Sequence, residues 1–324
     1  MFAYIIRRIL YAIPILIGVN LITFILFFMV NSPDDMARFQ LGQKYVTPAA
    51  IAQWKHANGY DQPLFFNAQA AGVGHLTQTL FFKKSLGLFA FNFGVSQRGR
   101  DIGQDIRQRM WPSLALAIPS LFIGLIVNIT LALFITFFRG SYLDIWGVGA
   151  CVLLMSISGL FYIIGGQYLF AKVLKITPIS GYLGGLSAIK FLLLPVAVSV
   201  IAGIGAGVRW YRTIFLEEIG KDYVRTARAK GLGENVVLFR HVLKNGMIPI
   251  LTGVVVIIPT LFMGSLIMES FFGIPGLGSY TIDAISQQDF EIVRVMVFLG
   301  TLFYVVGLIL TDISYTLVDP RVKF

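Results

Sequence analysis

The sequence predicts an all-α membrane protein with six transmembrane helices. The chain has 324 residues, of which 56% are hydrophobic and only 13% are charged, whereas a soluble domain carries about 25% charged residues. Six stretches lack Asp, Glu, Lys and Arg and approach or exceed the roughly 17–25 residues that a spanning helix needs. Backbone polar groups in lipid must be satisfied within the segment, so these stretches are expected to be helices. They are Ile9–Pro33, Met110–Phe138, Ile145–Ala171, Phe191–Val208, Asn245–Met268 and Val295–Thr311.

The first stretch follows Arg7-Arg8, which would also suit a signal peptide or a twin-arginine signal. Its apolar run is longer than the roughly 7–15 residues of a signal peptide, and no small-residue cleavage site follows it. We therefore expect residues 1–33 to form a cytoplasmic N-terminus and an uncleaved first span.

Residues 34–109 are too polar for the bilayer and are expected to form a small subdomain on its outer side. Pro48–His56 has a short helical pattern, Gly59–Leu64 is typical of a turn, and Leu86–Gly94 is expected to be an extended apolar piece. The remaining five spans would form a core over residues 110–324.

Basic residues near span ends predict the orientation, because Lys and Arg collect in cytoplasmic loops. With six spans, the N-terminus, the loop after the fourth span and the C-terminus share one side, which is expected to be the cytoplasm. Three lysines between Lys172 and Lys190 lie on the other side and weaken the bias slightly. The cytoplasmic cations are Arg7, Arg8, Arg209, Arg212, Lys221, Arg225, Arg228, Lys230, Arg240, Lys244, Arg321 and Lys323.

Several chemistries lack support. There is no P-loop, no H-E-x-x-H and no G-x-S-x-G motif, so neither ATP binding by this chain nor a protease or acyl hydrolase is indicated. The single cysteine, Cys151, and three widely spaced histidines indicate no disulfide, metal or cofactor site. The net charge of +10 would suggest nucleic acid in a soluble protein, but the asymmetry of membrane loops explains it, and no nucleic-acid partner is expected.

Two further patterns invite structural interpretations. The glycines of Gly203–Val208 are expected to permit close helix packing. Ionisable residues near spans are functional candidates by default. Glu269, Arg294 and Asp312, however, lie at predicted span ends, where they can reach the interface, so a structural role is favoured.

The segment from Ile214 to Asn245 predicts a helix, a tight glycine turn and a second helix. Phe215, Ile219 and Tyr223 recur every four residues, as on one helix face. Glu217 has the spacing to pair with Lys221. Arg228 and Lys230 suit the negative end of the helix dipole.

Gly231 then has the place of a helix-ending residue with positive φ. Asn235–Asn245 resumes a helical pattern, and Pro249 is expected to open the next span.

Three interpretations of this loop compete. A DNA-binding helix-turn-helix is disfavoured because both ends are tied directly to the bilayer. A simple connecting loop would explain the basic charge but not the small residues Ala227, Ala229, Gly231 and Gly233. Small residues let a partner approach the backbone closely, so we predict that a cytoplasmic partner docks on this loop.

The same residues carry a family resemblance. Membrane subunits of ABC importers share an E-A-A-x3-G-x9-I-x-L-P loop. Here Arg225-Thr-Ala227 occupies the E-A-A positions, Gly231 is the glycine, and His241, Leu243 and Lys244 stand at I, L and P. The peptide-permease branch reads Y-V-R-T-A-R-A-K-G-L, then R-H-x-L-x-N and a later proline, which this chain matches almost residue for residue. Further similar stretches are Arg7-Arg8, Tyr60–Leu64, Phe93–Ser96, Glu269 with Pro275–Gly278, and Val318–Val322.

The chain thus resembles the DppB/OppB-like permease subunits of the dipeptide, oligopeptide and nickel branch. The resemblance implies a type I ABC importer permease fold, with residues 34–109 in the periplasm, in the bacterial inner membrane with both termini cytoplasmic. It implies a transport subunit rather than an enzyme, moving short peptides into the cytoplasm. Implied partners are a second permease, two ATPases that bind ATP and Mg, a periplasmic binding protein and membrane lipid.

The resemblance also implies site residues. A cytoplasmic loop at about 212–246 would couple the permease to the ATPase. Its expected coupling residues are Tyr223, Arg225, Thr226, Ala227, Arg228, Ala229, Lys230, Gly231, Leu232 and His241. Candidates for a periplasmic gate or a structural role there are Glu269, Pro275, Gly276 and Gly278.

Alternatives remain open at this point. Nickel, opines and antimicrobial peptides are other substrates of the same branch, although the sequence offers no His/Cys ligand set for a bare metal ion. A secondary transporter would be expected to show internal repeats and midplane charges, and neither is evident. A membrane-embedded enzyme would need a catalytic constellation.

Overall fold

A computed structural model describes residues 2–30, 32–42 and 46–318. Within these ranges every regular element is a helix, and the only strand-like feature is an isolated bridge between Val95 and Asp101. The expected all-α class is confirmed.

Within the described ranges, five helices are long and apolar enough to cross a bilayer, and a sixth candidate is a bent pair. Phe191–Val208 and Val295–Thr311 lie within spanning helices, and Met110–Phe138 does so except for its last residue. Ile9–Pro33 and Asn245–Met268 end beyond their spanning helices. The main elements are α1 (Phe2–Ile25), α5 (Ile102–Phe137), α8 (Ala188–Ile219), α11 (Leu243–Ile257) and α14 (Phe290–Val318). The bent pair is α6 (Tyr142–Ser156) with α7 (Gly159–Gly166) and the π-helical segment η4 (Gln167–Val173).

The chain groups into two compact units. The first contains residues 1–108 and 283–305, and the second contains 109–282 and 306–324. The expected segments 1–33, 34–109 and 110–324 stay a prediction.

The first unit contains the polar region after α1. Its elements are η1 (Leu26–Val30), α2 (Pro33–Leu41), α3 (Pro48–Ala57), α4 (Gly74–Thr77), η2 (Phe81–Ser85) and η3 (Leu86–Ala90). Ser32 and Thr47 cap α2 and α3 by accepting backbone N–H bonds, and a proline follows each cap. Phe24, Phe28 and Tyr60 form the centre of an aromatic cluster beneath these helices.

The expected extended piece at Leu86–Gly94 is wrong, because its first five residues form the 3₁₀ helix η3. This turn buries Leu88 while Phe89 meets Phe298 edge-on, with ring centroids 5.2 Å apart. An extended segment would send adjacent side chains to opposite faces.

In the second unit, the third expected span is not one straight helix. It breaks after Ser156 and bends by 87° before α7. Ile157 and Ser158 have extended backbone, and the Tyr162 hydroxyl donates to the Leu154 carbonyl at 2.8 Å. That bond satisfies one carbonyl that the end of α6 leaves without a helical partner.

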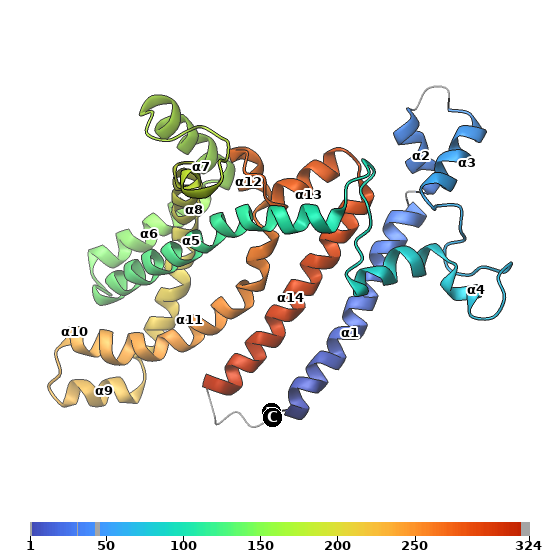
Figure 1. The fold of residues 1–324 in the computed structure, drawn as a ribbon. Coiled ribbons are helices and arrows are strands. Elements are labelled where there is room, and N and C mark those ends of the chain that lie inside the picture. Colours follow the sequence, from blue (N-terminus) through green and yellow to red (C-terminus); the bar gives the residue numbers. More distant parts are fainter. Residues whose placement is uncertain (1, 31, 43–45, 319–324) are drawn as a thin grey trace. The chain divides into compact units, whose positions relative to one another are not determined.

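The bent pair nevertheless follows α8 along its length (Figure 1). Asp144 at the start of α6 pairs with Arg212 near the end of α8. Further along, Gly205 lies against Met155, and Gly166 lies against Val198 near the start of α8. Counted as one span, the bent pair brings the candidate crossings among the described residues to six.

Glycines allow this close packing. A Cβ on Gly205 would lie 2.6 Å from the carbonyl oxygen of Cys151, and one on Gly207 would lie 2.5 Å from the Asn128 side chain. The packing interpretation holds for these two glycines, whereas Gly203 has nothing within 4 Å.

The expectation that Pro249 opens the fifth span is wrong. Helical structure runs without a break from α10 (Glu234–Val236) through the π-helical η6 (Val237–Val242) into α11, and Pro249 lies inside α11. Proline is tolerated in membrane helices because neighbouring groups satisfy the freed carbonyl. The second helix of the loop and the fifth span thus form one continuous rod.

The second unit is completed by shorter elements. They are η5 (Gly185–Ser187), α9 (Asp222–Ala229), η7 (Pro259–Met263), α12 (Leu266–Phe272) and the start of α13 (Leu277–Ser286).

Substituting Gly205 tests the close contact of α6 with α8. We expect Gly205→Val to lower the stability of the detergent-solubilised protein by about 1–3 kcal/mol, because the added side chain meets backbone atoms that cannot turn away. Gly203→Val, on the same helix with open space around it, is the matched control. Thermal unfolding followed by size-exclusion chromatography measures both. Equal melting temperatures would contradict this packing.

Candidate functional site

The loop that was predicted to couple to an ATPase begins where α8 ends, at Ile219, and α9 starts after Lys221. The buried carboxylate of Glu218 accepts from the Lys221 amine at 2.5 Å and from the Tyr223 hydroxyl. The single helix expected through Phe215, Ile219 and Tyr223 is therefore wrong. Lys221 pairs with Glu218 rather than Glu217, since the chain turns before the i,i+4 partner could face it.

The glycine turn agrees with its expected geometry. Gly231 has φ +78°, its N–H donates to the Arg228 carbonyl at 2.9 Å, and the Leu232 N–H reaches the Ala227 carbonyl at 3.3 Å. These bonds end α9, and the left-handed conformation favours glycine because it has no Cβ.

A bidentate ion pair closes the hairpin formed by α9 and α10. Arg228 donates to both carboxylate oxygens of Glu234, at 3.0 and 2.7 Å, and Arg139 from the turn after α5 reaches the same carboxylate at 3.3 Å. Arg228 was expected to face a partner, but it is fastened within the chain. The sequence signal for this pair was Glu234, an acid just after the glycine turn. Helical spacing rules do not pair Glu234 with Arg228, because the turn separates the two residues.

The inner face of α9 packs into the core of the second unit. Val224 and Ala227 are buried against Val237, Leu238 and Val242 of η6. Ala227 is 4% exposed, so its small side chain serves packing between α9 and η6. The interpretation that Ala227 lets a partner approach the backbone stays a prediction.

The outer face of the hairpin contains a cavity of about 470 Å³. It brings together six of the ten expected coupling residues and adds Arg240. Arg225, Arg228, Ala229 and Gly231 lie outside its lining. The lining residues are Tyr223, Thr226, Ala227, Lys230, Leu232, Arg240 and His241.

The Tyr223 hydroxyl is engaged within the chain, where it donates to Glu218. Burial, followed by the hydrogen bond to Glu218, raises the pKa of Tyr223 to about 12. Its hydroxyl therefore stays protonated at neutral pH and remains the donor to Glu218. The Thr226 hydroxyl donates to the Asp222 carbonyl.

The second expected group surrounds Glu269 on α12. The expectation that this residue reaches the membrane interface is wrong, because it is 0% exposed. The carboxylate accepts from the backbone N–H groups of Ser265 at 3.2 Å and Ser279 at 3.0 Å. Ser113 lies beside it and accepts from the Leu277 N–H at 2.8 Å. Burial raises the pKa of Glu269, and the hydrogen bonds act in the opposite direction.

The glycines around Glu269 leave room for this carboxylate. A Cβ on Gly264 or Gly276 would overlap the Glu269 carboxylate, and one on Gly278 would lie 2.6 Å from the Ser265 carbonyl. Pro275 is exposed at the turn between α12 and α13. Glu269 thus stabilises the turn between α12 and α13 by accepting hydrogen bonds from backbone N–H groups on either side of it.

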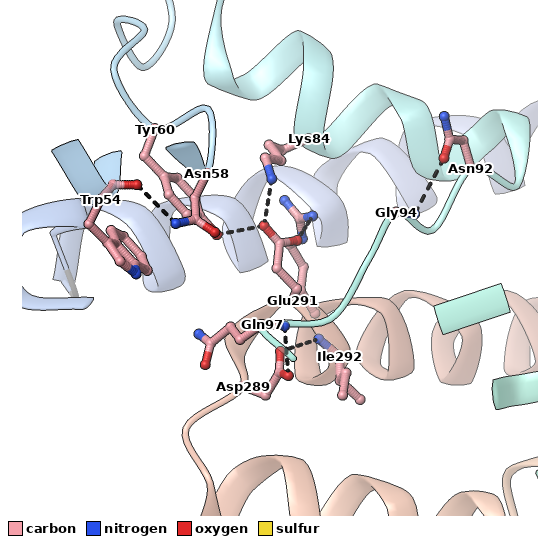
Figure 2. A network of polar contacts seen from close by, with 11 residues as sticks. Trp54, Asn58, Tyr60, Lys84, Asn92, Gly94, Gln97, Asp289, Glu291 and Ile292 are labelled. Carbon is pink, nitrogen blue, oxygen red and sulfur yellow. Dashed lines mark hydrogen bonds and ion pairs between the residues drawn. The ribbon is translucent and has the colours of Figure 1, made fainter. Parts of the chain in front are cut away.

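A polar network in the first unit was not predicted (Figure 2). The buried Glu291 at the start of α14 accepts from the Tyr60 hydroxyl at 2.7 Å, Lys84 at 3.0 Å and Arg294 at 2.5 Å. Nearby, Asp289 accepts from the Gln97 N–H at 3.1 Å. Burial, then the charge of Glu291, raises the pKa of Tyr60. Arg294 is buried rather than at a wet span end.

Removing the Glu269 carboxylate tests its role as an acceptor. Glu269→Ala leaves the N–H groups of Ser265 and Ser279 without their acceptor, at a cost of about 1–3 kcal/mol for each. We expect a clear fall in the melting temperature of the purified protein and a smaller fall for Glu269→Gln, which keeps one oxygen. The exposed Glu217→Ala is the control. A melting temperature for Glu269→Ala that equals the control's would contradict the assignment.

Comparison with known proteins places this chain in a family. Residues 128–324 match the family described as binding-protein-dependent transport system inner membrane component, and residues 1–86 match the N-terminal part of such membrane components. The chain is 32% identical over 330 residues to a putative peptide transport system permease protein of Brucella abortus, with both chains covered in full.

Two further relatives extend the comparison. The oligopeptide transport system permease protein AppB of Bacillus subtilis is 28% identical over 339 residues, with both chains covered in full. The dipeptide transport system permease protein DppB of Escherichia coli is 26% identical over 351 residues, covering all of this chain and 99% of the relative. The chain belongs to the family of binding-protein-dependent transport system inner membrane components.

Proposed function

We propose that this permease imports short peptides from the periplasm to the cytoplasm, driven by ATPase subunits that dock on the α9–α10 hairpin. The observation that carries the proposal is the hairpin itself. The ion pair of Arg228 and Glu234 closes the hairpin, and its second helix is continuous with the fifth span. Its outer face contains a cavity that cations line.

The continuous helix offers a way to couple docking to transport. A displacement of the hairpin would move α10, η6 and α11 together, since no loop lies between them. The Arg212–Asp144 pair, with a shortest distance of 2.7 Å, ties the same end of α8 to α6. ATP-driven closure of the ATPases would thereby reach several membrane helices at once.

Orientation follows from six crossings and the distribution of basic residues. The cations from Arg209 to Lys244 support a cytoplasmic position of the hairpin, because Lys and Arg collect in cytoplasmic loops. The N-terminus then lies on the same side, and residues 34–109 lie in the periplasm. Arg321, Lys323 and the similar stretch from Asp319 to Val322 fall outside the described residues. The membrane would be the bacterial inner membrane.

The partners follow from the family. A binding-protein-dependent system implies a periplasmic binding protein, and we propose a second, homologous permease and two ATPases beside it. Since this chain has no P-loop, ATP and Mg would be held by the ATPases. Peptides are the proposed substrate because the three relatives described above are named as peptide, oligopeptide and dipeptide permeases.

Gly231 offers a test of the hairpin's role. We expect Gly231→Val to uncouple transport from ATP hydrolysis, because a β-branched residue at positive φ costs about 1–2 kcal/mol and distorts the turn. Gly233→Ala is the matched control, since that glycine has φ −63° and open space around it. Substrate-stimulated ATPase activity of the assembled transporter measures both. Normal coupling in Gly231→Val would count against hairpin docking.

Uptake tests the substrate. In a strain without other peptide permeases, we expect deletion of this chain to abolish growth on a di- to oligopeptide that supplies a required amino acid. Restoring the chain should restore growth. If every tested peptide still enters while nickel or opine uptake is lost, the peptide assignment is wrong.

A further inference from the structure

The cavity on the α9–α10 hairpin carries positive charge that the chain does not neutralise. Lys230, Arg240 and His241 line it, and no lining residue is acidic. Among the described residues, no hydrogen bond or ion pair engages the side chains of these three. The other polar side chains of the lining are occupied, since Tyr223 donates to Glu218 and Thr226 donates to the Asp222 carbonyl.

The nearby acids point to other partners. Glu218 accepts from Lys221, and Glu234 accepts from Arg228 and Arg139. Asp222 lies on the solvent side of α9, with its side chain 95% exposed, and pairs loosely with Arg225 at 3.5 Å. The cavity therefore presents two permanent cations and a histidine to a ligand from outside the chain.

The cations of the cavity lie at different distances from the bilayer. The charge-free run of α8 ends at Val208, yet the helix continues to Ile219, and α9, which precedes Lys230, begins only after it. Those eleven residues of α8 add about 16 Å at 1.5 Å per residue, whereas headgroups occupy about 5–8 Å on each side of the hydrocarbon core. Arg240 and His241 are closer, about 6–8 Å from the charge-free run that begins at Asn245. A lipid phosphate would therefore reach Arg240 and His241 but not Lys230, and the docking proposed for this hairpin favours a protein ligand.

We propose that this cavity receives an aspartate or glutamate side chain of the ATPase subunit. The inference rests on the proposed function, in which the ATPase docks on the hairpin. It adds that the hairpin in turn accepts a side chain of the ATPase. At about 470 Å³, the cavity can hold a carboxylate side chain together with bridging waters, each of which takes about 30 Å³.

Charge reversal tests the proposal in the assembled transporter reconstituted in vesicles. We expect Lys230→Glu and Arg240→Glu each to weaken ATPase binding about tenfold or more, because a like charge then faces the incoming carboxylate. Lys244→Glu is the matched control, since Lys244 is exposed one helical turn after Arg240 but does not line the cavity. Affinities for all three that stay within about twofold of wild type would overturn the proposal.

Cross-linking identifies the occupant. A carbodiimide should join the Lys230 amine to an Asp or Glu of the ATPase, and Lys230→Arg should abolish the product, as mass spectrometry can show. Changing the identified acid to lysine should restore binding to Arg240→Glu. A Lys230 cross-link to any other chain would overturn the proposal.

Two outcomes separate the alternatives. If Arg240→Glu weakens binding only when the vesicles contain phosphatidylglycerol, and not in phosphatidylcholine alone, the cavity holds a lipid phosphate and the proposal fails. If no ATPase binds the wild-type complex under any condition, the proposed function fails instead.

Discussion

Arg228 and Arg139 both bind the Glu234 carboxylate, and this interaction holds the α9–α10 hairpin in one orientation. An exposed ion pair contributes little stability, typically about 0.2–1 kcal/mol. Its bidentate geometry matters more, because two parallel bonds fix the orientation of α9 against α10. The third contact ties the hairpin to the turn after α5. These bonds add to the packing of Val224 and Ala227 against η6, and together they define the shape of the cavity that Lys230 and Arg240 line.

Two buried carboxylates organise other parts of the chain. Glu269 accepts backbone N–H groups where α12 turns towards α13, and it tolerates burial because those donors replace water. Glu291 instead gathers Tyr60, Lys84 and Arg294 in the first unit. Glu291 joins segments distant in sequence through their side chains, whereas Glu269 holds a local turn through the backbone N–H groups of Ser265 and Ser279.

Sequence reasoning succeeded where a local pattern determines the structure. Charge-free runs predicted the spans, and Gly231 predicted a left-handed helix end. It failed where tertiary contacts decide. At the bend after Ser156, the Tyr162 hydroxyl satisfies the Leu154 carbonyl across the break. The buried position of Glu269 depends on glycines that leave space for its carboxylate. The ion pair of Arg228 depends on a turn that places Glu234 beside it. Rules for residue spacing within one helix cannot predict these contacts, because each contact crosses a turn or a break.

The most direct test of the central claim, that an ATPase docks on the hairpin in the cytoplasm, is cysteine accessibility. Ala229 is exposed on α9, and the buried Cys151 can be replaced by serine. A cysteine at position 229 should react with an impermeant reagent in inside-out vesicles but not in intact cells, and the purified ATPase should protect it. Labelling in intact cells, or no protection by an ATPase that restores transport, would contradict the account.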